Sequence, residues 1–210
     1  EERKGGGGML ENVQEMLQNR QVKPLGKQRE YAVLLPLVQC NDEWHVLYEV
    51  RSKKISQPGE TSFPGGRVEK GETFEEAAVR ETMEELNIPR ERINVLGEID
   101  FISNEYVTIH CFVGYLDVDV EKIAFNEEVA DIFTIPLEFL IENRPTYFTS
   151  EFHIKHPKDF PYDMIPNGRK YRFKAGQHRI PFYDLKSRSL WGYTANLTDH
   201  FIDLVVKKTT

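Results

Sequence analysis

The sequence predicts one α/β domain in which helices cover a mixed β-sheet. Apolar runs typical of strands alternate with segments that have helical spacing, a pattern that favours a sheet covered by helices. The length of 210 residues is within reach of one such domain. With 40% hydrophobic and 29% charged residues, the composition is that of a globular chain with a sizeable core. We expect the domain to span residues 9–207.

The first 18 residues are expected to form a leader and a helix. The stretch 1–8, EERKGGGG, ends in four glycines, whose backbone freedom makes any single conformation costly. We interpret it as a flexible or artificially added leader. A short amphipathic helix is predicted over 9–18, because apolar residues recur at helical spacing at Leu10, Val13, Met16 and Leu17. We expect this helix to pack against the domain.

Four extended runs are predicted to pair as two hairpins. Residues 31–38 and 44–50 are rich in aliphatic and aromatic side chains and are separated by the polar turn NDE. Residues 93–102 and 106–116 form the second pair, divided at Ser103 and Asn104. Because strands and helices are interspersed along the chain, a mixed sheet covered by helices is the expected architecture.

The last third of the chain predicts two helices and two further strands. Residues 136–143 begin with a proline at a plausible first helical position. Residues 148–154 and 179–183 are strand candidates around a connection rich in proline and glycine. Apolar residues three or four apart over 190–207 predict a helix that faces the core.

A glutamate-rich helix is predicted between Thr73 and Leu86. Thr73 can cap its amino end, and Glu76 three positions later completes a capping box. Asn87 tolerates the left-handed conformation that ends helices, and Pro89 prevents extension. Local chemistry alone therefore sets both helix boundaries.

Three carboxylates gather near the carboxyl end of this helix. Glu81, Glu84 and Glu85 are three or four residues apart, so they project from overlapping parts of one face. They repel one another and lie at the negative end of the helix dipole. A solvated acidic face is one interpretation. A bound divalent cation is the other, and oxygen-only ligands favour Mg²⁺ or Mn²⁺.

The flanking residues favour the cation. Gly65 and Gly66 stand where a strand leads into a tight loop, so backbone groups can approach a ligand closely. Arg80, next to Glu81, can hold the carboxylates in position. The sequence therefore predicts a metal-dependent site.

The same segment resembles the Nudix box, in which a glycine and a glutamate precede an Arg-Glu-aliphatic-x-Glu-Glu run. Thr82 stands in place of the usual aliphatic residue and Asn87 in place of the usual glycine. The matching positions are Gly66, Glu72, Arg80, Glu81, Glu84 and Glu85. The resemblance implies an α/β/α sandwich that hydrolyses a nucleoside diphosphate linked to another moiety.

The resemblance also implies roles for individual acids. Glu81 and Glu85 are the expected metal ligands, and Glu84 is the expected general base, with a share in the metal site. Arg80 completes the catalytic set. A further catalytic or ligating acid is expected in the NEEV segment, at Glu128 rather than Glu127, unless both are surface residues.

The segment ahead of the box resembles the coenzyme A pyrophosphatase signature, in which Arg-Ser precedes a glycine, three residues and Phe-Pro-Gly-Gly. Arg51, Ser52, Gly59 and 63–66 match it, but the spacing is one residue shorter and Ser56 replaces an arginine. Coenzyme A carries a 3'-phosphate that needs local cations. The expected substrate-binding residues are Arg51, Arg67, Gly65 and Gly66.

Three functions remain open at this point. The leading one is Mg²⁺- or Mn²⁺-dependent cleavage of coenzyme A, or its acyl derivatives, to 3',5'-ADP and (acyl-)4'-phosphopantetheine. The same chemistry on ADP-ribose or another nucleoside diphosphate derivative is the first alternative. A non-catalytic nucleotide-sensing module is the second alternative.

Composition excludes some partners and suggests a compartment. A net charge of -7 argues against sequence-independent nucleic acid binding, and no run approaches the roughly 18 apolar residues of a membrane span. Cys40 and Cys111 lie in apolar runs as expected for buried thiols, which fits a reducing cytoplasm. The expected partner is a small nucleotide of the coenzyme A class, with a homodimer left open.

Overall fold

The computed structural model describes residues 7–174 and 176–207, and this part of the chain forms two sheets. The larger has the strand order β3-β2-β1-β7-β5, with β4 paired to β1, β6 to β7 and β8 to β2. Its strands are β1 (Arg29–Cys40), β2 (Glu43–Arg51), β3 (Thr61–Ser62), β4 (Gly65–Arg67), β5 (Ile93–Glu98), β6 (Ile102–Ser103), β7 (Val107–Leu116) and β8 (Val129–Pro136). The smaller sheet contains β9 (Thr146–Phe152), β10 (Gly176–Asp184) and β11 (Ser189–Trp191).

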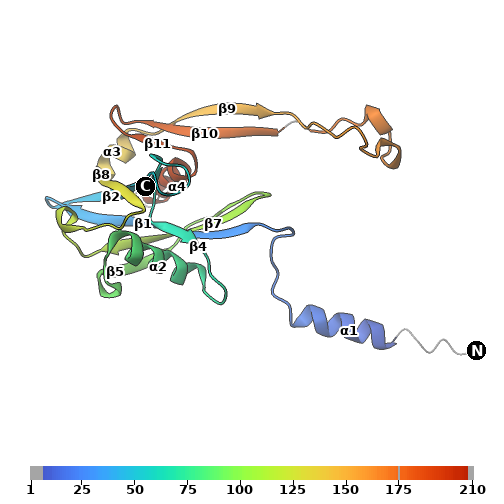
Figure 1. Ribbon diagram of the computed structural model, residues 1–210, viewed down its shortest axis with the longest axis horizontal. Helices are drawn as coiled ribbons and strands as arrows, with labels where there is room; N and C mark the ends of the chain where they lie inside the picture. The colour runs from blue at the N-terminus through green and yellow to red at the C-terminus, as the bar shows by residue number, and fades with distance from the viewer. Residues whose placement is uncertain (1–6, 175, 208–210) are drawn as a thin grey trace, which may run out of the picture.

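The larger sheet is mixed and lies between helices, as the sequence predicts. Strands β1 and β7 are parallel, whereas the other pairs are antiparallel. Helix α2 (Phe74–Leu86) covers one face, and α3 (Leu137–Glu142) and α4 (Gly192–Lys207) cover the other (Figure 1). Short 3-10 helices lie at Arg90–Arg92, Val120–Lys122, Tyr162–Met164 and Gly168–Lys170. The arrangement is an α/β/α sandwich.

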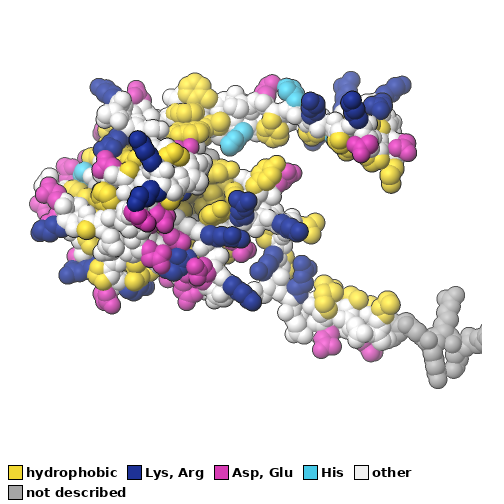
Figure 2. Space-filling model, viewed as in Figure 1, with side chains coloured by type: hydrophobic (Ala, Val, Ile, Leu, Met, Phe, Trp, Pro, Cys, Tyr) yellow, Lys and Arg dark blue, Asp and Glu magenta, His cyan; other side chains and the backbone are white. Residues whose placement is uncertain are grey.

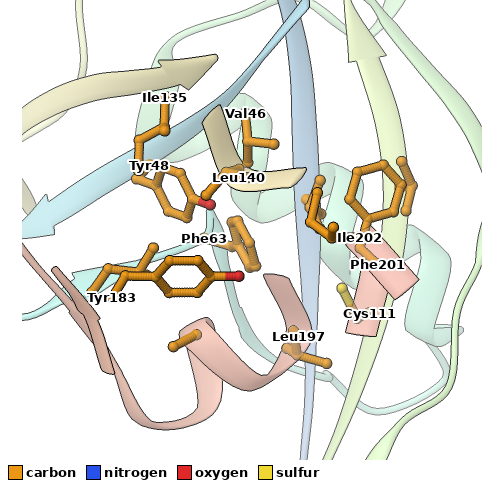
Figure 3. Packing of buried hydrophobic residues seen from close by; sticks show 14 residues of the cluster. Val46, Tyr48, Phe63, Cys111, Ile135, Leu140, Tyr183, Leu197, Phe201 and Ile202 are labelled. Atoms are coloured by element: carbon orange, nitrogen blue, oxygen red, sulfur yellow. The ribbon is translucent and has the colours of Figure 1, made fainter. Parts of the chain in front are cut away.

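The core on the α4 face is built around an aromatic stack. Tyr48 of β2 stacks on Phe63, with ring centroids 5.2 Å apart (Figure 3), and also on Phe133, with ring centroids 5.4 Å apart. Its buried hydroxyl shares a 3.1 Å hydrogen bond with Thr198 of α4. Leu140 of α3 packs into the same core. Both helices are thereby fixed to this face.

The core on the opposite face positions the acidic helix. Ala77, Ala78 and Leu86 of α2 are fully buried against the sheet, beside Leu34 and Leu47. Burial of a full apolar side chain contributes about 1.5–3 kcal/mol, so this seam fixes the rotation of α2 about its axis. The remaining helix faces, which carry the arginine and glutamates, are therefore presented in one orientation.

The predicted hairpins form, with some changes at the boundaries. Strands β1 and β2 turn through Asn41 and Asp42, which have φ values of 49° and 65° that suit a tight hairpin turn. Strands β5 and β7 form the second hairpin, with β6 as a separate short strand between them.

Other expected boundaries differ from the structure. Strand β8 was not predicted, because its apolar alternation follows directly on an acidic turn. Leu190 lies in β11 rather than in the last helix, which begins at Gly192. Pro136 is the residue before the first turn of α3 rather than its first helical residue. Its ring is still compatible with the start of a helix.

The expected packing of the first helix against the domain is wrong. Helix α1 (Gly7–Gln18) projects away from the sandwich, and all of residues 8–18 are exposed (Figures 1 and 2). Met9 and Leu10 are 73% and 69% exposed. Apolar spacing gives the conformation of a helix, but it does not say what the apolar face contacts. Of the expected leader, residues 1–6 lie outside the described part, and Gly7 and Gly8 open α1.

The smaller sheet forms a second projection. Strands β9 and β10 extend beyond the sandwich as a long two-stranded arm (Figure 1).

Within the described residues, no helix combines the length and hydropathy that crossing a membrane requires.

Candidate active site

Helix α2 begins and ends with the capping groups that the sequence predicts. Thr73 Oγ1 accepts a hydrogen bond from the Glu76 amide at 3.2 Å, and the Thr73 amide donates to Glu76 Oε2 at 2.8 Å. Asn87 closes the helix with a φ of 49°. A side-chain cap is worth about 1 kcal/mol, so these residues define where the helix and its glutamates stand.

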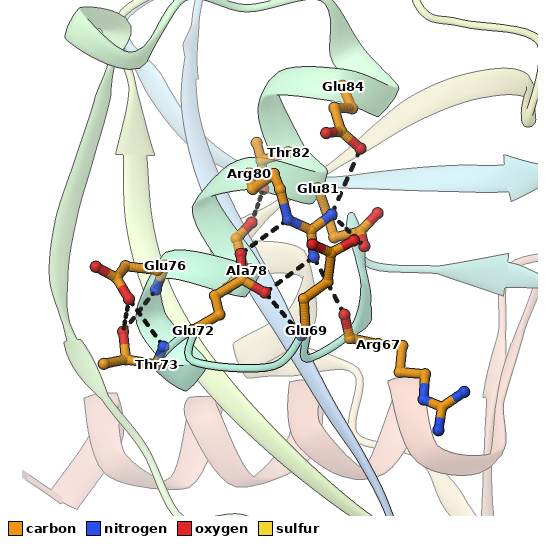
Figure 4. A network of polar contacts seen from close by, with 10 residues as sticks. All are labelled: Arg67, Glu69, Glu72, Thr73, Glu76, Ala78, Arg80, Glu81, Thr82 and Glu84. Atoms are coloured by element: carbon orange, nitrogen blue, oxygen red, sulfur yellow. Dashed lines mark hydrogen bonds and ion pairs between the residues drawn. The ribbon is translucent and has the colours of Figure 1, made fainter.

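Arg80 connects the acids of this helix to the loop before it (Figure 4). Its guanidinium forms two bonds to Glu72, at 2.8 and 3.1 Å, and one to the Arg67 carbonyl at 3.1 Å. Nη1 donates to Glu81 Oε1 at 2.7 Å and reaches Glu84 Oε2 at 3.5 Å. The hydrogen bonds from Arg80 lower the pKa of Glu72. Arg80 therefore orients a carboxylate of the loop and carboxylates of the helix.

Two glycines let the loop approach these carboxylates. The Gly65 amide donates to Glu85 Oε2 at 2.9 Å. A Cβ atom on Gly66 would lie 2.4 Å from Glu81 Oε1, and one on Gly65 would lie 2.4 Å from the Ala32 carbonyl oxygen of β1. A side chain at Gly65 would meet the backbone of β1, whereas a side chain at Gly66 would force the Glu81 carboxylate to move.

The carboxylates of Glu81 and Glu85 are held in an environment that disfavours their charge. Glu85 is 5% exposed. Burial, together with the charges of Glu81 and Glu128, raises the pKa of Glu85 to about 8, despite the opposing Gly65 amide. Burial also raises the pKa of Glu81, and Arg80 opposes that effect. A cation placed here would stabilise the ionised form of both groups.

A second loop brings Glu128 to the same site. The Asn126 amide donates to the Glu85 carbonyl, and the Ser52 amide donates to the Glu128 carbonyl, each at 2.8 Å. The charge of Glu128 acts on Glu81 and Glu85. Glu127 instead pairs with Lys54 at 2.5 Å. The geometry therefore favours Glu128 over Glu127 as the acid nearest the cluster.

The two arginines named for substrate binding have different surroundings. Arg51 Nε donates to the Ser56 carbonyl at 2.8 Å, and Nη2 lies 3.4 Å from Ser56 Oγ. These bonds hold the loop after β2, and the Arg51 charge acts on Glu85. Arg67 is exposed, and its side chain extends away from Arg80 (Figure 4). Arg51 is thus close to the acids, whereas Arg67 joins the site through its carbonyl.

Glu49 is a site residue that the sequence did not predict. It lies on β2, is 3% exposed, and its Oε1 has no hydrogen-bond partner in the described part of the chain. Its burial and the neighbouring Glu85 charge raise its pKa well above the ordinary range. The signal that could have identified Glu49 is its position in the run LYEVR, where a charged residue stands among neighbours that predict a buried strand.

The donor set suits a hard divalent cation. Glu81, Glu84 and Glu85 supply carboxylate oxygens, the ligands that Mg²⁺ and Mn²⁺ prefer. Within residues 7–174 and 176–207, no three acidic, histidine or cysteine side chains already surround one point. Glu81 faces Arg80 and Glu85 faces the Gly65 amide. Cation binding would therefore require these side chains to turn toward the ion.

A hollow of about 800 Å³ lies elsewhere, between β8, α3 and the turn before β11. Phe133, Tyr183 and Arg188 line it, and the acidic cluster contributes no residue to it. Because the charged chemistry lies at α2, we place the candidate active site at the acids rather than in this hollow.

Comparison with known proteins finds similar sequences and structures. The NUDIX domain family model matches residues 28–153. Nudix hydrolase 3 of Caenorhabditis elegans is 32% identical over 83% of this chain and 72% of its own length. The mouse peroxisomal coenzyme A diphosphatase NUDT7 is 27% identical over 56% of this chain and 51% of its own length. A solved MutT/nudix family protein from Enterococcus faecalis is 15% identical over 97% of this chain and 71% of its own, with a TM-score of 0.48.

Proposed function

Because the chain belongs to the Nudix hydrolase family, we propose that it cleaves the pyrophosphate bond of coenzyme A or its acyl derivatives. The products would be 3',5'-ADP and 4'-phosphopantetheine or its acylated form. The observation that carries this proposal is the cluster of Glu81, Glu85 and Glu128 beside the Gly65 amide. Glu85 is buried, Glu81 is half-buried and Glu128 is exposed, and acids that repel one another in this way suit a site that binds cations and a pyrophosphate.

The acids and the arginine of α2 have different proposed roles. Glu81 and Glu85 would hold the cation, with Glu84 sharing in the site. A bound Mg²⁺ or Mn²⁺ supplies charge neutralisation for the pyrophosphate and a lowered pKa for water. Glu84, which is exposed at the surface of α2, would accept the proton of the attacking water. Arg80 keeps Glu81 and Glu84 on one side of the helix.

Glu128 is the second candidate for the proton acceptor. Its loop is hydrogen-bonded to both Ser52 and the end of α2, so its backbone is held beside the acids. A base is identified by a loss in kcat that exceeds the loss in cation affinity. Glu84→Gln and Glu128→Gln, measured side by side, separate the two assignments.

Coenzyme A is proposed as substrate on two grounds. The segment 51–66 carries the Arg-Ser and Phe-Pro-Gly-Gly elements, and it folds as the loop and short strands directly beside the acids. One relative is named a coenzyme A diphosphatase. Arg51, fixed at the start of this loop, is the proposed contact for the 3'-phosphate. Arg67, whose exposed side chain extends away from Arg80, is proposed as a more distant substrate contact.

Steady-state kinetics on coenzyme A, dephospho-coenzyme A and ADP-ribose test the substrate. A charge-assisted contact contributes about 1.5–3 kcal/mol, so kcat/KM should favour coenzyme A over dephospho-coenzyme A by roughly ten- to a hundredfold. Arg51→Ala should reduce that preference. Arg92→Ala, which removes a surface arginine paired with Asp117, is the matched control and should leave the preference unchanged.

Two results would contradict the substrate assignment. Equal kcat/KM for coenzyme A and dephospho-coenzyme A would mean that the 3'-phosphate is not recognised. Faster cleavage of ADP-ribose than of either coenzyme would mean that the substrate belongs to another class of nucleoside diphosphate derivatives.

A further inference from the structure

Glu49 is buried on the side of β2 that faces the acidic helix. Side chains alternate along a strand, and Tyr48 belongs to the core under α4 while Leu47 belongs to the core under α2. Glu49 continues the alternation of Leu47 and so points toward α2. Among the neighbouring charges, that of Glu85 on this helix has the largest effect on Glu49.

Ser62 stands beside Glu49 on the neighbouring strand. The two residues are directly opposed in the antiparallel pair of β2 and β3, so their side chains lie on the same face of the sheet. In the described residues, Glu49 Oε1 and Ser62 Oγ are both buried and both lack a hydrogen-bond partner. Two buried oxygen atoms on directly opposed strand residues thus share the face of the sheet that α2 covers, and neither has a hydrogen-bond partner in the described residues.

The surrounding charges compensate a carboxylate at this position only in part, through Arg51. Glu81, Glu85 and Glu128 are acidic and repel it. Arg51 is the basic residue nearby, but its Nε and Nη2 are directed to Ser56. A buried charge without a partner is costly. A charged Glu49 therefore needs a positive partner, and no basic side chain among the described residues forms a hydrogen bond with its Oε1.

We propose that Glu49, with Ser62 beside it, is an additional oxygen ligand for a divalent cation held by the acidic cluster. The inference rests on the proposed function, because it concerns the cation of that same site. It extends the ligand set from the helix to the sheet. The cation would then bridge β2 and α2, and its binding would relieve the repulsion between Glu49 and Glu85.

Direct measurement of Mn²⁺ binding to the substrate-free protein tests this assignment. Electron paramagnetic resonance of free Mn²⁺ gives both the Kd and the number of bound ions. Glu49→Gln keeps the shape of the side chain and removes its charge. We expect it to weaken Mn²⁺ binding at least fivefold or to remove one bound ion.

Two further variants make the measurement decisive. Glu43→Gln alters an exposed glutamate of the same strand and should leave the Kd within twofold of the parent. Glu49→Leu removes the carboxylate while filling the buried space with an apolar group, so it tests the same loss if Glu49→Gln fails to fold. The melting temperature without metal shows whether each variant is folded.

The outcomes separate this inference from the proposed function. Less than fivefold weakening in a folded Glu49 variant, with the number of ions unchanged, would overturn the ligand assignment. If Glu81→Gln weakens binding in the same experiment, the proposed function stands without Glu49. If the parent binds no Mn²⁺, both fail.

Discussion

Replacing Glu85 should change how the stability of the metal-free protein depends on pH. The folded state holds the Glu85 proton up to a pKa of about 8, whereas a free glutamate releases it near 4.5. The unfolded state therefore binds fewer protons between these values, and stability must fall as pH rises through that window. At about 1.36 kcal/mol per pH unit, the loss between pH 5 and 8 is at most about 4 kcal/mol. Glu85→Gln cannot ionise and should remove most of this loss.

Urea unfolding at a series of pH values, with a chelator present, measures the effect. The difference between parent and Glu85→Gln isolates Glu85 from the other titrating groups. Glu75→Gln, which alters an exposed glutamate of the same helix, should follow the parent curve. The reasoning would be refuted if the unfolding free energy of the parent, minus that of Glu85→Gln, stayed constant or increased from pH 5 to 8. Saturating Mg²⁺ should flatten the parent curve, because the ion replaces the proton.

Three other predictions concern the same helix and its loop. Glu81→Gln should lower kcat/KM for coenzyme A at least a hundredfold, because a charged ligand becomes an amide, and activity within threefold of the parent would remove the assignment. Gly66→Ala should reduce Mn²⁺ affinity and turnover together, since its Cβ would meet the Glu81 carboxylate, as a titration and kinetics would show. Asn87→Val should cost about 1–2 kcal/mol of unfolding free energy by chemical denaturation, whereas Asn87→Gly should cost less, because only the β-branched residue resists a φ of 49°.

The acidic helix was predictable because its boundaries depend on neighbouring residues. Thr73 and Glu76 form the expected capping box. Asn87, which stands in place of the usual glycine, takes the left-handed conformation that glycine would adopt there. The mixed sheet and its helical layers also followed from alternating patterns. The helix caps are set within a few residues along the chain, whereas the pairing of β1 with β7 joins segments far apart and was expected only as a general architecture.

Long-range features were harder to predict. The apolar spacing of α1 indicated a helix, but its exposure depends on what lies near it in space. Glu49 resembles any polar residue in a strand until the fold places Ser62 and Glu85 around it. The sequence favoured Glu128 over Glu127, but the Lys54 pair of Glu127 and the effect of Glu128 on Glu81 and Glu85 are contacts between distant segments.

Product identification tests the central claim most directly. The parent protein is incubated with coenzyme A and Mg²⁺ in ¹⁸O-labelled water, and the products are identified by mass spectrometry. The account predicts 3',5'-ADP and 4'-phosphopantetheine, with one ¹⁸O atom incorporated per cleavage, and no products from Glu81→Gln under the same conditions. Intact coenzyme A, cleavage at another bond, or equal product from Glu81→Gln would contradict it.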